Sequence, residues 1–201
     1  MNAFERLLTL VEEQPLSRSL PTALIVASTI ADKSLASWVR LELMGYLAGN
    51  PAMRDDTIVP EYRSVTGQWY DDYGRMFALD DSQLGFINEL RLREGVAELE
   101  GLAAGGGTLA MRPTELSEII RKGLNIEVSV FQFRPSSVSQ VLTNIKVHLL
   151  DHLASRMSKI KELPDIQVMK EPEILQIKPG LYGVSIDMKA LWRRVFNEKP
   201  K

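Results

Sequence analysis

The chain contains two histidines, four residues apart at positions 148 and 152. In a helix this spacing places both imidazole rings on one face, the geometry that two ligands of a single metal ion require. Asp151 lies between them and takes the place of the glutamate in the H-x-x-E-H zinc motif, with a side chain one methylene shorter. His148, Asp151 and His152 are therefore a candidate metal site. The alternative is a surface pair beside the apolar stripe of a helix.

One carboxylate, Glu42, falls within the apolar face of a predicted helix, between Trp38 and Tyr46. A buried carboxylate without a partner is strongly destabilising, so Glu42 requires an ion pair or hydrogen bonds. Arg63, on the nearby strand-forming segment, is the expected partner. We favour a structural ion pair between helix and strand, and a catalytic carboxylate is the alternative.

Two further patterns suggest nucleic-acid chemistry. Pro164 and Asp165, followed by QIK at 176–178, form a degenerate nuclease signature, in which an acidic group and a lysine hold Mg²⁺ and a water. Chance placement of common loop residues is the alternative. Basic side chains in the last third of the chain could bind phosphates, with a solvated helix face as the alternative. These side chains are Arg156, Lys159, Lys161, Lys170, Arg193 and Arg194.

The elements that must position these residues begin with helices. Apolar residues recur at helical spacing before Pro15, again over about 21–30, and over about 33–47. From residue 51 the character changes, because 59–70 and 75–79 are rich in β-forming residues and predict two strands. Helical spacing returns over 82–102 and 114–122.

The C-terminal half contains the longest predicted helix, over about 136–162, which carries both histidines. Strict alternation in residues 125–133 predicts a strand directly before it. An extended region at 166–186 and a short helix at 189–197 follow. The sequence thus predicts an α+β fold with an N-terminal helical group, a small antiparallel sheet and a long helix in the C-terminal half.

Composition limits the class of protein. The 201 residues include 24 basic and 26 acidic side chains, and 45% are hydrophobic, as in an ordinary globular protein. The absence of cysteine excludes disulfides and thiolate zinc sites, and it suits the reducing cytoplasm, where we expect the protein. The longest apolar stretch, residues 20–31, is shorter than the ~20 residues that a bilayer span needs. We expect no membrane association and no cofactor.

The near-neutral total charge conceals an asymmetry. Residues 51–107 carry 5 basic and 11 acidic side chains, whereas residues 108–201 carry 15 and 10. Packing of the two regions on each other is one explanation, and an exposed basic surface for a partner or nucleic acid is the other. We expect a single domain over 1–201, with a helical region at 1–50, a strand-rich acidic region at 51–107 and a basic helical region at 108–201.

Two sequence blocks carry a family resemblance: WVRLELMGY at 38–46 and PEYR at 60–63. Together with Asp32, the ELE at 98–100 and the YGV at 182–184, they make the chain resemble the AbiTii domain family, named after bacterial abortive-infection systems. The resemblance spans nearly the whole chain and implies no known catalytic residues. The two blocks contribute six residues to one candidate functional or structural cluster: Trp38, Glu42, Tyr46, Glu61, Tyr62 and Arg63.

The resemblance implies a role in bacterial defence against phages. We favour a non-enzymatic interaction or regulatory module that contacts a protein partner encoded in the same operon and self-associates. One alternative is a metal-dependent toxin of the nuclease type, in which Glu42, Glu61, Arg63 or the histidine group would meet in an open pocket. The other is a small-ligand sensor with a pocket near Trp38 and Tyr62.

Overall fold

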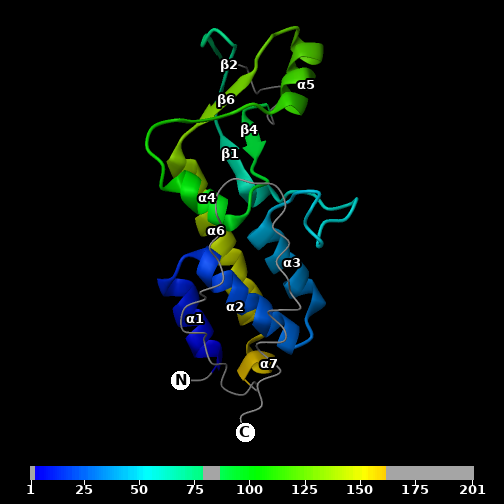
Figure 1. The fold of residues 1–201 in the computed structure, drawn as a ribbon, viewed down its shortest axis with the longest axis vertical. Coiled ribbons are helices and arrows are strands. Elements are labelled where there is room, and N and C mark those ends of the chain that lie inside the picture. The colour runs from blue at the N-terminus through cyan, green and yellow to red at the C-terminus, as the bar shows by residue number, and fades with distance from the viewer. Residues whose placement is uncertain (1–2, 79–86, 162–201) are drawn as a thin grey trace. The chain divides into compact units, whose positions relative to one another are not determined.

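The computed structural model describes residues 3–78 and 87–161, and the described chain opens with three helices (Figure 1). These are α1 (Ala3–Glu13), α2 (Leu16–Thr29) and α3 (Lys33–Met44). α2 begins five residues before the predicted start, so that Pro21 lies inside the helix. Asp32 caps α3, because its Oδ1 accepts a hydrogen bond of 2.9 Å from the Leu35 amide. The predicted N-terminal helical group is confirmed.

Short antiparallel strands form two small sheets. The strands are β1 (Ser64–Thr66), β2 (Gln68–Tyr70), β3 (Met76–Phe77), β4 (Glu89–Arg91), β5 (Leu109–Met111) and β6 (Val130–Phe133). β1 pairs with β4, and the other four form a sheet in the order β3-β2-β6-β5. A 3₁₀ turn, η1 (Glu61–Arg63), leads directly into β1. The predicted strand over 125–133 is confirmed only in its second half, as β6.

Gly67 allows one extended segment to contribute to both sheets, as β1 before it and β2 after it. A Cβ at this position would lie 2.3 Å from the carbonyl oxygen of Gln132 and 2.6 Å from the ring of Phe131. The Gly67 amide donates a 3.1 Å hydrogen bond to the carbonyl of Asn88, next to β4. The segment therefore passes from one sheet to the other without losing its backbone partners.

Four further helices follow the early strands: α4 (Val96–Ala103), α5 (Thr114–Leu124), α6 (Pro135–Ala154) and α7 (Met157–Lys161). The prediction of a single helix over 82–102 is wrong, because residues 89–91 form β4, which pairs with β1, and a helix begins only after Gly95. Strand pairing has overridden a local helical pattern there. The helix predicted over 136–162 is also divided, at Ser155 and Arg156. The predicted elements at 166–186 and 189–197 lie outside the described residues.

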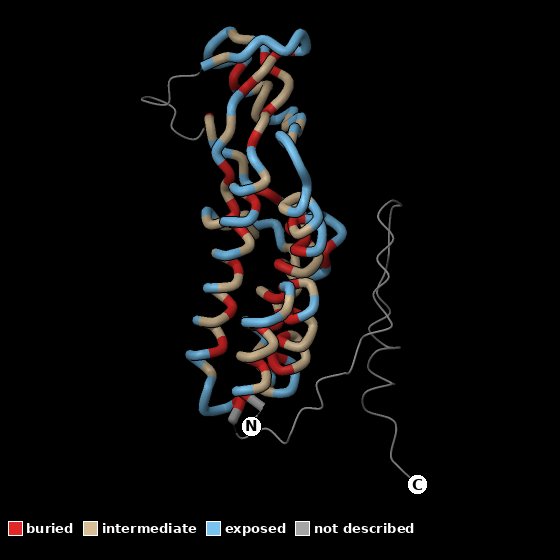
Figure 2. The backbone as a smooth tube through the Cα atoms, turned by 90° about the vertical axis from the view of Figure 1, so that its left-hand side faces the viewer, coloured by how far each residue is buried: buried red, intermediate tan, exposed pale blue. Residues whose placement is uncertain are grey.

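The core lies between the helices and continues beneath the four-stranded sheet (Figure 2). α2 packs on α3, and α4 packs on α6. On the sheet, Trp69 meets Phe131 edge to face with their ring centroids 5.1 Å apart. The Trp69 indole donates a 2.8 Å hydrogen bond to the carbonyl of Ile87, so this buried ring leaves no unpaired polar atom. The predicted α+β class is confirmed.

All described residues belong to one compact unit, Met1–Val168, and the expectation of a single domain over 1–201 stays a prediction. Among the described residues, two ion pairs join the acidic and basic regions: Arg112 with Asp72 at 2.9 Å, and Arg93 with Glu115 at 3.9 Å. Both are exposed, so their contribution to stability is small. Among the described helices, none has the length and apolar character needed to cross a bilayer.

The end of α3 and the segment before α4 approach each other closely at Gly45. This residue has φ +79°, and a Cβ there would lie 2.4 Å from the carbonyl oxygen of Arg93. The next amide, that of Tyr46, donates a 2.7 Å hydrogen bond to the same carbonyl. A side chain at position 45 would therefore strain the backbone and separate two segments that are bonded together.

We expect Gly45→Ala to lower the free energy of unfolding by more than about 2 kcal/mol, because a positive φ and a backbone clash act together. Gly49→Ala is the matched control, since nothing lies within 4 Å of a Cβ there, and it should change stability by less than about 0.5 kcal/mol. Urea denaturation of both variants measures the difference. Equal stabilities would contradict the close approach.

Candidate functional site

The candidate site is built around Glu42, on the buried side of α3 with Leu35 and Val39. Its side chain has no exposed surface. Removing a carboxylate from water is costly, so the fold must supply partners for both of its oxygens. The sequence places Glu42 on this face through helical spacing, and its partners are Tyr46, four residues later, and two neighbouring residues of η1.

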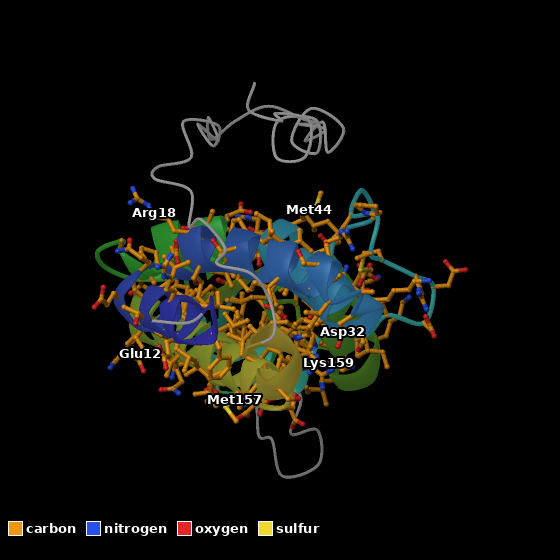
Figure 3. The ribbon with its side chains drawn as sticks, turned by 90° about the horizontal axis from the view of Figure 1, so that it is seen from below. Glu12, Arg18, Asp32, Met44, Met157 and Lys159 are labelled. Carbon is orange, nitrogen blue, oxygen red and sulfur yellow. The ribbon has the colours of Figure 1, made fainter. Side chains whose placement is uncertain are left out.

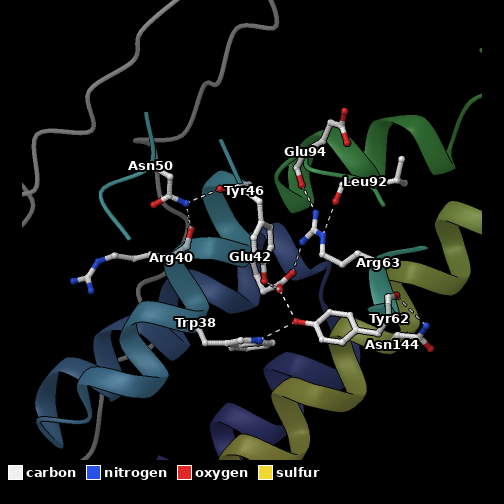
Figure 4. Close-up of polar contacts among 11 residues, drawn as sticks. Trp38, Arg40, Glu42, Tyr46, Asn50, Tyr62, Arg63, Leu92, Glu94 and Asn144 are labelled. Atoms are coloured by element: carbon white, nitrogen blue, oxygen red, sulfur yellow. Dashed lines mark hydrogen bonds and ion pairs between the residues drawn. The ribbon is translucent and has the colours of Figure 1, made fainter. Parts of the chain in front are cut away.

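Three side chains donate hydrogen bonds to the Glu42 carboxylate (Figure 4). Arg63 donates from Nη1 to Oε2 and forms a fully buried ion pair, which confirms the predicted pairing. The hydroxyl groups of Tyr46 and Tyr62 both donate to Oε1, at 2.8 and 2.7 Å. Trp38 donates from Nε1 to the Tyr62 hydroxyl at 3.0 Å. We call these five residues the Glu42 network.

The Arg63 guanidinium joins α3 to the segment between β4 and α4. Its Nε donates to the carbonyl of Leu92 at 2.9 Å, and its Nη2 donates to the carbonyl of Glu94. Its Cζ lies 5.0 Å from the centroid of the Tyr46 ring, within the range of a cation–π contact. Each of its nitrogens therefore has a partner, as a charge without exposed surface requires.

Both tyrosines remain protonated hydrogen-bond donors. Burial raises the pKa of Tyr46 far above its usual value, and the negative charge of Glu42 raises it further. The same two causes, in the same order, raise the pKa of Tyr62. A phenolate beside the Glu42 carboxylate would place two negative charges in contact, away from water. Neither tyrosine is therefore suited to act as a base or nucleophile.

Sequence reasoning missed two asparagines that support the network. Asn50 is buried, and its Nδ2 donates to the carbonyl oxygens of Gly45 at 2.7 Å and Arg40 at 3.1 Å. It thereby binds the carbonyl of Gly45, which follows the last residue of α3, and a carbonyl about one turn earlier in the helix. Asn144 on α6 donates to the carbonyl of Tyr62 at 3.2 Å. Asn50 could have been found from the sequence only as a polar residue soon after Gly45, which ends the helix. No sequence feature indicated the role of Asn144.

The two histidines of α6 lie against the aromatic rings of the Glu42 network. The ring centroids of His148 and Tyr62 are 4.2 Å apart, and those of His152 and Trp38 are 4.7 Å apart. The two groups that the sequence suggested separately therefore meet in one place. Asp151 is exposed. Within residues 3–78 and 87–161, no group of three His, Asp or Glu side chains is arranged to hold a metal ion.

Glu61, the sixth predicted member, is exposed and takes no part in the bonds to Glu42. The predicted nuclease pattern at 164–178 lies outside the described residues, as do Lys170, Arg193 and Arg194. Among the predicted basic residues, Lys159 is exposed on α7. Arg156 is engaged within the protein.

Arg156 links the end of α6 to the start of α3. Its Nε donates to Asp32 Oδ2 at 2.5 Å, and its Nη1 donates to the carbonyl of His152 at 3.0 Å. The hydrogen bond from Arg156 lowers the pKa of Asp32, and the bond from the Leu35 amide lowers it further. Asp32 and Lys159 lie near each other in the view from below (Figure 3), and the positive charge of Lys159 also lowers the pKa of Asp32. The ion pair of Arg156 with Asp32 marks the point where α6 stops and α7 begins.

The His152 ring favours its neutral form. Burial lowers its pKa, and the nearby positive charges of Arg156 and His148 lower it further, whereas Asp32 and Asp151 oppose the shift. A neutral imidazole packs against Trp38 without the cost of desolvating a charge. Protonation of His152 would therefore weaken its contact with Trp38, one of the links between α6 and α3.

The arrangement defines a class of protein: an α+β module whose most reactive side chains are joined in one buried polar network between helices and sheets. The chain belongs to the AbiTii family, whose model matches residues 7–173. The family name places it in the context of bacterial abortive infection and defence against phages. No curated protein and no solved structure matches the chain.

We expect Glu42→Gln to lower the free energy of unfolding by about 3–5 kcal/mol, because it leaves the buried Arg63 without a counter-charge. Glu61→Gln is the matched control: it makes the same chemical change at an exposed position nearby and should be nearly neutral. Urea denaturation followed by tryptophan fluorescence compares the two. Unchanged stability of Glu42→Gln would refute a structural role for the pair.

We expect the wild-type protein to lose stability as the pH falls from 7 towards 5, in part through His152. Because the pKa of His152 is lower in the folded than in the unfolded state, the unfolded chain binds more protons in this range. The contribution of His152 to stability is complete at pH values above its pKa in the unfolded chain, about 6.5, and it is lost as the pH falls through its pKa in the folded protein.

His152→Phe keeps a ring against Trp38 that cannot be protonated, so its unfolding free energy should vary less between pH 7 and 5. Asp32 does not confuse the comparison, since its lowered pKa affects stability only below about pH 4. Equal pH dependence in the two proteins would show that His152 is not the responsible group.

Proposed function

We propose that the protein is a non-enzymatic interaction module of a bacterial abortive-infection system, acting in the cytoplasm on a protein encoded in the same operon. One observation carries this proposal: both oxygens of Glu42 accept hydrogen bonds from three side chains, and its side chain has no exposed surface. The Glu42 network has the residue types of an active site, but its polar atoms are hydrogen-bonded to one another.

A hydrolytic carboxylate must reach a water, a substrate proton or a metal ion. Glu42 has no lone pair directed at solvent, Arg63 has no exposed surface, and both tyrosines hold their protons. The two histidines face Tyr62 and Trp38. These contacts support a structural role for the cluster, which leaves the outer surface to carry the function.

We expect phage protection by Glu42→Gln to follow the amount of folded protein. Cells that carry the operon with this variant should lose protection at 37 °C, where the destabilised protein unfolds, and recover it at 20 °C, where more of it is folded. Plating efficiency of phage and the amount of soluble protein, measured at both temperatures, test this. Glu61→Gln should protect at both.

A catalytic role gives the opposite result. Glu42→Gln would then fail to protect even where it is fully folded. Purified wild-type protein would also cleave RNA or DNA in the presence of Mg²⁺ or Zn²⁺, and Glu42→Gln or His152→Ala would lose that cleavage. Either finding would overturn the non-enzymatic proposal.

A further inference from the structure

The turn between β2 and β3 is ordered by a single buried carboxylate. Asp71 Oδ1 accepts hydrogen bonds from the amides of Tyr73 at 2.9 Å and Arg75 at 2.8 Å, and its Oδ2 accepts one from Arg75 Nε at 2.6 Å. The Asp71 amide donates to the Arg75 carbonyl at 3.1 Å. Gly74 supplies the positive φ, +77°, that closes the turn. The backbone of residues 71–75 therefore has one well-defined conformation.

A second carboxylate fastens this turn to the rest of the sheet. Asp72 Oδ1 accepts hydrogen bonds from Arg112 Nη1 at 2.9 Å and from Ser129 Oγ at 2.8 Å. Arg112 follows β5 directly, and Ser129 immediately precedes β6, so both anchors belong to the neighbouring strands. Asp71 therefore stabilises the turn internally, and Asp72 fixes it to the neighbouring strands.

This ordered turn presents apolar surface to solvent. Tyr73 is 86% exposed and Met76, on the edge strand β3, is 55% exposed. The Arg75 side chain is 72% exposed, and its guanidinium lies over the Tyr73 ring with Cζ 5.6 Å from the centroid. We call Tyr73, Arg75 and Met76 the turn tip. Large apolar side chains are usually exposed singly, whereas Tyr73 and Met76 are exposed close together on one ordered turn.

The chemistry of the turn tip is that of a contact anchor. Tyrosine and arginine are enriched among the residues that dominate binding energy at protein interfaces. Binding also costs less conformational entropy when the anchor is already held in place, as Asp71 and Asp72 hold this turn. Removing the Tyr73 ring would leave the hydrogen bonds of the turn intact, because Asp71 accepts its bond from the Tyr73 backbone amide.

We propose that the turn tip binds a separate protein that offers an apolar pocket with a carboxylate at its rim. The pocket would receive Tyr73 and Met76. Arg75 supplies the carboxylate contact: its Nε donates to Asp71, and its side chain is 72% exposed, so its two Nη groups can bind one carboxylate of the partner side by side. The inference rests on the proposed function, because it identifies the surface through which an interaction module would act.

Charge argues against nucleic acid as the occupant. The tip offers one arginine, and the neighbouring Arg112 is paired with Asp72. A phosphate backbone is bound by several basic groups together, so a single carboxylate suits the tip better than a nucleic acid.

Photocrosslinking from the tip tests the proposal directly. Tyr73 is replaced by the photoreactive residue p-benzoylphenylalanine, and cells carrying the intact operon are irradiated. Ile58, 75% exposed on the loop after α3, is the matched control position. We expect position 73, and not position 58, to cross-link to the product of a neighbouring gene. A cross-link to a second copy of this chain or to nucleic acid, or none at all, would overturn the proposal.

Affinity then separates the parts of the tip. The partner identified by cross-linking is purified, and its dissociation constant is measured with each variant. Tyr73→Ser and Arg75→Gln should each raise this constant at least about tenfold, whereas Ile58→Ser should leave it unchanged. Thermal unfolding of Tyr73→Ser should match the wild type. Wild-type affinity in both tip variants would refute the tip as the contact. These measurements report binding and not cleavage. The turn-tip proposal can therefore fail while nuclease assays still support a non-enzymatic protein.

Discussion

The buried ion pair between Glu42 and Arg63 is the constraint on which the rest of the described structure depends. Two opposite charges without exposed surface are tolerated only when their remaining hydrogen-bonding capacity is used as well. This requirement explains why two tyrosine hydroxyls and two backbone carbonyls converge on the pair. It also explains why α3, η1 and the segment before α4 must meet at one point, since each supplies part of the shell.

The position of Arg63 transmits this constraint to the sheets. It ends η1, and β1 begins at the next residue, so the guanidinium fixes the place where the extended segment leaves the helices. The Arg63 carbonyl accepts a 3.0 Å hydrogen bond from the Leu92 amide, which continues the contact with the strand partner. Gly67 then carries the segment into the second sheet, and the turn after β2 lies at its end (Figure 1). The buried Arg63 thus sets the direction of the segment that runs through β1 and β2 to the exposed turn.

The aromatic and imidazole rings extend the same network to α6. Trp38 and Tyr62 are bonded to each other, and each also packs against one histidine of α6. Arg156 closes this contact at the end of the helix through Asp32. Residue types that suggest catalysis in a sequence are here buried and hydrogen-bonded to one another, which occupies the atoms that chemistry would need.

Local sequence determined much of this protein. Helical spacing marked α1, α3 and most of α6, alternation marked β6, and the position of Glu42 within an apolar face required a buried partner. Family-specific blocks identified the AbiTii relationship. Local pattern failed where strand pairing competed with it, at residues 89–91, and it did not show the break between α6 and α7, where Arg156 pairs with the distant Asp32. Only the tertiary structure decided that both histidines lie on the Glu42 network, that Glu61 lies outside it, and that Asn50 and Asn144 support it. Contacts of this kind reach a separation of 124 positions, between Asp32 and Arg156. A sequence pattern that repeats every two to four residues has no information about such pairs.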